Sequence, residues 1–284
     1  MGRKREHTID DSYFEKINNH KKAYILGFLY ADGSIDKNGF SFGIHKRDVK
    51  ILEFIKKELK TDYSIKTNCD PYIRFQIVSA KITKNLISLG IVRKKTYKSK
   101  KLPKISNSEL FNSMLCGFFD GDGSIYSSKY KNRREEFGCC FSGNIWVLTQ
   151  IKKHLNVNGI STGKIRYRHP TNYSCMLEIR GTYNIKKLFQ LLYNNNDFML
   201  SRKHNKFIEF SNNSKLLRQR ISDEKINEIK IYYTSGLKQF EISEKMGIPK
   251  STVRSIVQRL RNFRTSSSIV SVIIWFLNIF SLYL

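Results

Sequence analysis

Cysteines and acidic residues are both scarce in this sequence of 284 residues, and each shortage excludes a class of protein. The cysteines are odd in number and contain no C-x-x-C pair, so the pattern is neither a disulfide framework nor a zinc site. The five are Cys69, Cys116, Cys139, Cys140 and Cys175. We expect reduced, apolar side chains in an intracellular protein. The polar N-terminal stretch MGRKREHTIDDSYFEK also lacks the apolar core of a secretory signal.

The shortage of acids leaves a large excess of positive charge. The chain has 24 Asp and Glu against 51 Lys and Arg, which gives a formal net charge of +27. A surface this basic attracts polyanions, of which nucleic acid is the commonest. Hydrophobic residues make up 40% of the chain and aromatic residues 13%, which indicates a folded protein with a sizeable core.

One apolar run, IVSVIIWFLNIFSLYL at 269–284, raises the question of a membrane. It is shorter than the ~20 residues that cross a bilayer as a helix, so we expect no membrane partner and treat 264–284 as a tail of unknown role. Lys, Asn, Ile and Tyr are plentiful, which is typical of an AT-rich genome. The compartment within the cell stays open between an organelle, a phage- or virus-infected cell and the cytoplasm.

The sequence contains an internal repeat. ILGFLYADGSI at 25–35 is matched by LCGFFDGDGSI at 115–125, and ILEFIKKELK at 51–60 is matched by VLTQIKKHLN at 147–156. IVSAKITKNLISL at 77–89 resembles IRGTYNIKKLFQLL at 179–192. The order is kept while the offset grows slowly, which is typical of a duplicated unit with small loop insertions in its second copy. We place the two copies at 15–105 and 106–212.

Each copy is predicted to run helix, two strands, helix, two strands, helix. In the first copy the helices are expected at 20–32, after Asp48 as a cap, and at 80–90, with strands at 40–45, 63–66 and 72–78. The second copy repeats this order over 108–194, with strands near 135–142, 164–169 and 173–180. The predicted fold class is α+β, with one antiparallel sheet in each copy.

The residues after the repeat predict a small all-helical domain at 218–263. Asp223 can begin a first helix, Gly236 separates it from a second, and the turn MGIPKS precedes a third. Two helices joined by a short glycine-containing turn are typical of a helix-turn-helix DNA reader, and an ordinary helical bundle is the alternative. The residues expected to contact DNA there are Lys250, Ser251, Thr252 and Arg254.

The repeated motif carries small residues four positions apart. Gly27 and Ala31 form such a pair in the first copy, and Gly117 and Gly121 form one in the second. Residues four apart share a helix face, and small side chains there let two helix backbones approach closely. We therefore expect the two motif helices to pack against each other through these four positions.

Each motif also ends in Asp-Gly. Packing of the two helices would place Asp32 and Asp122 side by side, while Gly33 and Gly123 would let the chain turn into the next strand. Two adjacent carboxylates repel each other without a cation, and Mg²⁺ binds both carboxylate and phosphate oxygens. The pattern predicts a divalent-metal site for phosphodiester hydrolysis, formed by these four residues. A simple helix stop is the alternative, which the second occurrence of the motif disfavours.

ILGFLYADG (25–33) and LCGFFDGDG (115–123) resemble the signature of the LAGLIDADG homing endonucleases, and the resemblance covers residues 15–210. It implies saddle-shaped sheets in a pseudo-symmetric monomer that cuts both strands of a long asymmetric DNA site across the minor groove, leaving short 3′ overhangs. The last Asp of each motif would act with Mg²⁺, and by position these acids are Asp32 and Asp122. The sixth motif position, often acidic in the family, is Asp120 in the second copy and Tyr30 in the first.

The resemblance also implies basic residues near the cut site and DNA contacts from the strands. The candidates for assisting catalysis are Lys94, Lys95 and Lys203, with a solvated helix end as the alternative for each. Polar and basic residues that alternate along the strands could face a DNA groove. The candidates among them are Arg74, Arg166, Arg168 and Arg180.

Two other functions stay open. A transcriptional regulator that binds DNA without cutting could combine a degenerate LAGLIDADG region with a helix-turn-helix, although both motif acids are present here. An RNA maturase could use the same fold to aid splicing of its host intron, which would make intron RNA a second partner. An intein is not expected, because the chain begins with Met and lacks flanking splicing residues.

Overall fold

The structure is a computed structural model that describes residues 7–93, 101–128, 136–168, 174–194, 196, 198–213 and 223–258. The chain divides into two compact units, residues 1–216 and 217–284. Two candidate basic residues, Lys94 and Lys95, and the tail at 264–284 lie outside the described residues. Within the described part of the chain, no helix is long and apolar enough to span a membrane.

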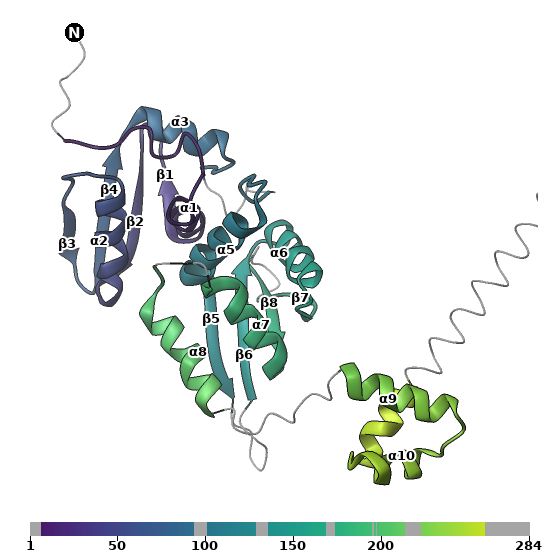
Figure 1. The fold of residues 1–284 in the computed structure, drawn as a ribbon. Coiled ribbons are helices and arrows are strands. Elements are labelled where there is room, and N and C mark those ends of the chain that lie inside the picture. Colours follow the sequence, from purple (N-terminus) through teal and green to yellow (C-terminus); the bar gives the residue numbers. More distant parts are fainter. Residues whose placement is uncertain are drawn as a thin grey trace, which may run out of the picture. The chain divides into compact units, whose positions relative to one another are not determined.

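The first unit contains two copies of one arrangement of helices and strands (Figure 1). The first copy consists of α1 (His20–Asp32), β1 (Gly33–Ile35), β2 (Gly39–His45), the short 3-10 helix η1 (Lys46–Asp48), α2 (Val49–Glu58), β3 (Ile65–Cys69), β4 (Tyr72–Val78) and α3 (Ala80–Ser88). The second consists of α5 (Ser108–Asp122), β5 (Gly123–Ser128), β6 (Glu136–Gly143), α6 (Ile145–Val157), β7 (Ile165–Tyr167), β8 (Cys175–Arg180) and α7 (Thr182–Tyr193). This confirms the predicted α+β fold class.

Each copy has one four-stranded antiparallel sheet, and the two sheets have equivalent strand orders, β1-β2-β4-β3 and β5-β6-β8-β7. In β4, Ile73, Phe75 and Ile77 are buried and the residues between them are exposed, which is the period-two pattern of a sheet with one covered face. Helices α2 and α3 pack on the first sheet, and α6 and α7 pack on the second (Figure 1). The opposite face of each sheet, here called the outer face, is not covered by these helices.

Short polar side chains begin most of these helices. Asn19, Ser79, Asn107 and Asn144 each accept a hydrogen bond from the backbone N–H three residues later. The prediction that Asp48 caps α2 in the same way is wrong, because its carboxylate makes no such bond. Both of its oxygens instead accept from Nε of an arginine in the second copy, which gives a stronger, charge-assisted interaction.

Helices α1 and α5 approach each other very closely in a contact that we call the seam. A Cβ atom on Gly27 would lie 1.8 Å from the carbonyl oxygen of Met114, and one on Gly117 would lie 2.0 Å from that of Tyr24. Met114 and Tyr24 occupy equivalent positions in the two motifs, so the two close approaches are related by the pseudo-symmetry of the copies. A backbone oxygen cannot move aside as a flexible side chain can, and glycine is therefore required at both positions.

A single apolar core runs through both copies. Its largest fully buried side chains include Phe28, Phe42 and Phe75 in the first copy and Phe118 and Phe141 in the second. The four cysteines whose side chains the structure describes, Cys116, Cys139, Cys140 and Cys175, are buried and free, as predicted.

One helix of the first unit was not predicted. Helix α8 (Ser201–Asn213) follows the second copy and contacts β5. Its buried residues are Lys203, Phe207 and Phe210, at spacings of four and three, which is a helical period. Because one of the three is a lysine, the sequence SRKHNKFIEFSNN shows only two apolar residues of the buried stripe, and the periodicity is not visible without the structure.

The second unit is a small helical bundle. It contains α9 (Asp223–Thr234), α10 (Gln239–Met246) and a third helical segment at 250–258. The turns between them use Gly236, at φ +95°, and Gly247, at φ +60°, which are left-handed conformations that favour glycine. Its core is formed by Ile229, Ile242, Ile248, Val253 and Val257.

Candidate active site

The two motif acids are the last residues of α1 and α5, so both lie at the same end of the seam. A Cβ atom on Gly121 would lie 3.3 Å from Oδ2 and 3.4 Å from Cγ of Asp32. The Asp32 carboxylate therefore lies against the residue that precedes Asp122. Asp32 is exposed and Asp122 is half-buried, so solvent and ligands have access to the pair. We call Asp32 and Asp122 the acid pair.

Gly33 and Gly123 end the motif helices and begin β1 and β5. Their backbones are extended, with φ of −82° and −84°, so they do not need glycine for a left-handed conformation. They need it for space, because a Cβ would lie 2.5 Å from the carbonyl oxygen of Leu29 or 2.4 Å from that of Phe119. The sharp change from helix to strand thus holds each acid at the base of its sheet.

The donors present at the acid pair fit a hard cation. Within the described residues there is no cluster of three or more His, Cys, Asp or Glu that could hold a metal ion. Mg²⁺ needs fewer protein ligands, because it keeps several waters and commonly binds one or two carboxylates together with phosphate oxygens. Asp32 and Asp122 supply two carboxylates from two helices, and they are the residues that would hold such an ion.

Lys203 is the candidate basic residue that the structure brings to this end of the seam. Its side chain is only 4% exposed. Nζ donates to the carbonyl oxygens of Phe119 at 2.7 Å, Asp120 at 2.6 Å and Gly121 at 3.2 Å. These carbonyls belong to the last turn of α5, where no helical N–H follows to bond them and the helix dipole is negative. An ammonium has three N–H groups, so Lys203 acts in this geometry as a buried positive charge rather than as a free donor.

The charge of Lys203 is coupled to the acids around it. Burial lowers the pKa of the Lys203 ammonium to about 8, while the negative charges of Asp120, Asp32 and Asp122 act in the opposite direction. An influence from both members of the acid pair shows that the ammonium lies within electrostatic reach of them.

Asp120, at the sixth motif position, is a fully enclosed carboxylate. Oδ2 accepts from the Tyr24 hydroxyl at 2.7 Å and from the Leu200 N–H at 2.7 Å, and Oδ1 accepts from the Tyr193 hydroxyl at 2.9 Å. Burial raises the pKa of the Asp120 carboxyl, although the hydrogen bonds from Tyr24 and Leu200 and the charge of Lys203 favour its ionised form. The three donors come from far apart in the sequence, and no local pattern could have indicated them.

The first copy forms a different bond at the equivalent position. The hydroxyl of Tyr30 donates to the carbonyl oxygen of Lys101 at 3.0 Å. The difference between Tyr30 and Asp120 therefore changes the polarity of the contact at the sixth motif position.

The four arginines proposed to contact DNA are all exposed and lie on or beside the outer faces of the sheets. Two of them have protein partners. Nη2 of Arg168 donates to Oγ of Ser142 at 2.6 Å, and Nη2 of Arg180 donates to Oε1 of Glu178 at 3.1 Å. Sequence reasoning did not include Lys66, which pairs in register with Arg74 across β3 and β4 and adds to the positive charge of the first sheet.

Glu178 is an acid among the cations of the second outer face. Burial favours a higher pKa for Glu178, but hydrogen bonds from the Tyr126 hydroxyl and from Arg180 outweigh it, so the pKa is lowered. The carboxylate is thereby kept ionised and fixes the arginine side chain on the sheet surface.

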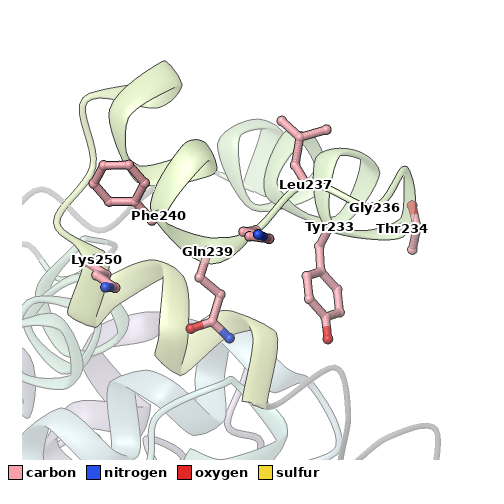
Figure 2. A pocket seen from close by; sticks show the side chains of 8 residues that line it. Tyr233, Thr234, Gly236, Leu237, Gln239, Phe240 and Lys250 are labelled. Carbon is pink, nitrogen blue, oxygen red and sulfur yellow. The ribbon is translucent and has the colours of Figure 1, made fainter.

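The second unit has an open hollow of about 640 Å³ between its three helices (Figure 2). Tyr233 from the end of α9, Lys238 and Gln239 from the start of α10, and Lys250 from the start of the third helix line it. Nζ of Lys250 lies 5.7 Å from the centre of the Phe240 ring, and both side chains stand on the same side of the hollow (Figure 2). The hollow is therefore bordered by two lysines and an exposed aromatic ring.

The third helix presents the residues proposed to contact DNA. It packs inward through Val253 and Val257, which are fully buried. Lys250, Ser251 and Arg254 are exposed and Thr252 is half-buried. This exposure is compatible with a helix that reads DNA, and the DNA-contacting role stays a prediction.

Comparison with known proteins identifies the family of the repeated motif. Residues 115–214 match the family model described as LAGLIDADG endonuclease. In fold, the chain is similar to meganuclease I-SmaMI bound to uncleaveable DNA, with a TM-score of 0.52, 14% identity, and coverage of 67% of this chain and 87% of that one. It is also similar to LAGLIDADG meganuclease I-AabMI bound to uncleaved DNA, with a TM-score of 0.52, 14% identity, and coverage of 76% and 98%.

A third similar structure is the I-LtrWI LAGLIDADG homing endonuclease bound to target DNA, with a TM-score of 0.50, 16% identity, and coverage of 74% and 94%. No curated protein matches the sequence. At these identities the structural likeness establishes the fold, and the family model establishes the sequence relationship for the second copy. The chain is thus a LAGLIDADG protein with the two-repeat fold of the homing endonucleases.

Proposed function

We propose that this protein is a site-specific homing endonuclease that hydrolyses one phosphodiester in each strand of a long, asymmetric DNA target. The observation that carries the proposal is the placement of the Asp32 carboxylate against Gly121, immediately before Asp122. A pseudo-dimer within one chain needs no second subunit to complete this arrangement, so the proposed active species is an intracellular monomer. Double-stranded DNA is its proposed partner.

Each part of the site has a role that follows from its position. The acid pair supplies one carboxylate from each copy, and the pseudo-symmetry assigns one to each strand. When bound there, a divalent cation such as Mg²⁺ would supply positive charge against the negative charge that develops on the phosphate oxygens. Lys203 holds a further positive charge beside the acid pair at the end of α5. The basic outer faces of the sheets would bind the DNA backbone and read its grooves.

Two further observations support DNA as the substrate. The net charge of +27 favours a polyanionic partner. The meganucleases of similar fold named above are described with DNA bound.

The test compares Asp32→Asn and Asp122→Asn with the wild type on a duplex that spans the uninterrupted insertion site of its own gene. With Mg²⁺, we expect double-strand cleavage to fall by on the order of 10²–10³-fold, because each change removes one carboxylate charge from the site. Binding measured without cleavage should be retained, since neither side chain is part of the basic outer faces.

Asp36→Asn is the matched control. Asp36 is also an acid of the first copy, but it is exposed and pairs with Arg93 at 3.4 Å away from the seam. This control should cut like the wild type. If both motif variants cut as fast as the wild type, the assignment of the acid pair is wrong. A wild type that binds a promoter and cuts nothing would indicate the regulator, and protein-dependent intron splicing would indicate the maturase.

A further inference from the structure

The side chain of Asp120 joins three elements that are distant in the sequence. Its carboxylate accepts from Tyr24 of α1, from Tyr193 at the end of α7, and from the backbone N–H of Leu200. The residue is only 1% exposed, so these three bonds take the place of water. Burying a carboxylate is costly even when it is bonded, and an apolar side chain would serve the core better.

The bond to Leu200 fixes the beginning of α8. The carbonyl oxygen of Leu200 accepts from the N–H of Lys203 at 2.9 Å and of His204 at 3.1 Å, which forms the first turn of the helix. The Lys203 side chain then returns to the carbonyl oxygen of Asp120 itself at 2.6 Å. Asp120 therefore holds both ends of one short loop, with its side chain on Leu200 and its backbone on the Lys203 ammonium.

The same short segment is also held by the first copy. The Phe198 ring stacks on Phe54 of α2 with 3.9 Å between ring centroids and 2° between planes. Nε of Arg202 lies 3.0 Å and 3.1 Å from the two carboxylate oxygens of Asp48. These contacts flank Leu200 on both sides, but only the Asp120 bond connects the segment directly to the motif helix that carries Asp122.

We infer that Asp120 is a positioning residue that places the Lys203 ammonium at the acid pair and makes the second copy differ from the first. The inference rests on the proposed nuclease function. Within the described residues, the equivalent Tyr30 instead bonds the carbonyl of Lys101, so the two copies hold their surroundings through groups of opposite polarity. Loss of the Asp120 bonds is therefore expected to slow the two strand cuts unequally, while DNA binding is retained.

The experiment compares Asp120→Asn with Asp120→Leu in the full chain. Asn keeps an oxygen for the Tyr24 hydroxyl and the Leu200 N–H, and its amide can donate to the Tyr193 oxygen. Leu has a similar volume and makes none of these bonds. Each strand carries its own end label, and the rate of each cut is measured at saturating protein together with the affinity for the uncut duplex.

For Asp120→Leu we expect the cut of one strand to slow by on the order of 10²-fold, since a catalytic group displaced by about 1 Å has an effect of that size. The affinity for DNA should change by less than about threefold, because the outer faces are not altered. Asp120→Asn should restore most of the lost rate. Thr83→Val is the control for loss of a buried hydroxyl bond, because Thr83 is 1% exposed and bonds only within α3.

A second readout does not depend on cleavage. Amide hydrogen exchange over 200–206 of the free protein should speed up in Asp120→Leu and stay near the wild-type rate in Asp120→Asn. Unchanged exchange in Asp120→Leu would overturn the inference even if the wild type does not cut DNA, which would by itself refute only the nuclease function. Equal slowing of both strands together with weaker DNA binding would also overturn it. So would an Asp120→Asn variant that is as slow as Asp120→Leu.

Discussion

Lys203 combines two properties that oppose each other in a single residue. It is a buried cation, which burial alone destabilises, and its three N–H groups are all donated to the end of α5. The carbonyls it bonds have no other helical donor, so the same contact that places positive charge beside the acid pair also completes the C-terminus of the motif helix. Catalysis and helix termination thus depend on one side chain.

Replacing this residue should therefore affect both stability and rate. Lys203→Met keeps the length of the side chain but leaves three buried carbonyl oxygens without donors, so we expect a loss of roughly 1–3 kcal/mol in the free energy of unfolding. The acid pair also loses its neighbouring positive charge, and cleavage should slow by on the order of 10²-fold. Denaturant unfolding and single-turnover cleavage measure the two effects.

Lys206→Met is the matched control, because Lys206 is an exposed lysine of the same helix. It should leave both quantities near their wild-type values. Equal cleavage by Lys203→Met and the wild type would restrict Lys203 to a structural role.

At the scale of helices, the seam between α1 and α5 is the element on which the site depends. Its closest approaches involve backbone atoms of both helices, so its geometry cannot adjust by rotation of side chains. The acids at its end come from two copies whose sheets share no strand. The separation of the acid pair is consequently set by how closely the two helices pack.

Gly117→Ala tests this dependence. The new Cβ would lie 2.0 Å from the carbonyl oxygen of Tyr24, and the helices must separate to admit it. We expect destabilisation of roughly 1–3 kcal/mol, near the upper end of that range, from overpacking. Cleavage should fall by more than DNA binding, because separation of the helices displaces the acids but leaves the outer faces intact.

Gly43→Ala provides the comparison for this change. A Cβ at Gly43, an exposed position of β2, meets no atom within 4 Å. Thermal unfolding should separate the two variants clearly. A Gly117→Ala protein as stable as Gly43→Ala would contradict the close approach of the helices.

At the scale of the whole molecule, the chain combines a two-repeat unit with a separate helical bundle. The second unit has its own core of five buried apolar residues, which allows it to fold apart from the repeats. The acid pair and its surroundings lie entirely in the first unit. The chemistry and the additional DNA contacts are therefore expected to be separable.

A truncated chain that ends at residue 216 should show this separation. Truncation removes the exposed Lys250 and Arg254, and for every phosphate that they neutralise the dependence of log K on log salt should flatten by about 0.9. We expect the affinity for DNA to fall by on the order of 10–10²-fold at moderate salt. The rate of cleavage at saturating protein should be retained.

The double variant Lys250→Ala/Arg254→Ala in the full chain checks the same point without removing the unit. It should change the salt dependence in the same direction by a smaller amount. If truncation alters neither the affinity nor its salt dependence, the second unit does not bind DNA.

The sequence by itself determined the duplication, the order of elements in each copy and the location of the two motif acids. These features depend on local periodicity and on similarity between segments of one chain, both of which can be read from the order of residues. The glycines of the motif also indicated a close helix contact, because their spacing places them on one face. Helix α8 escaped prediction because a lysine occupies one position of its buried stripe.

The tertiary structure alone decided what surrounds the acids. Asp48 bonds Arg202 instead of capping its own helix, and Asp120 binds donors that are up to 96 residues away in the sequence. Lys203 is buried rather than solvated because α8 packs against the end of α5. In each case the partner depends on how one copy packs against the other. A side chain's direction is then set by a segment distant in the sequence, which no local pattern encodes.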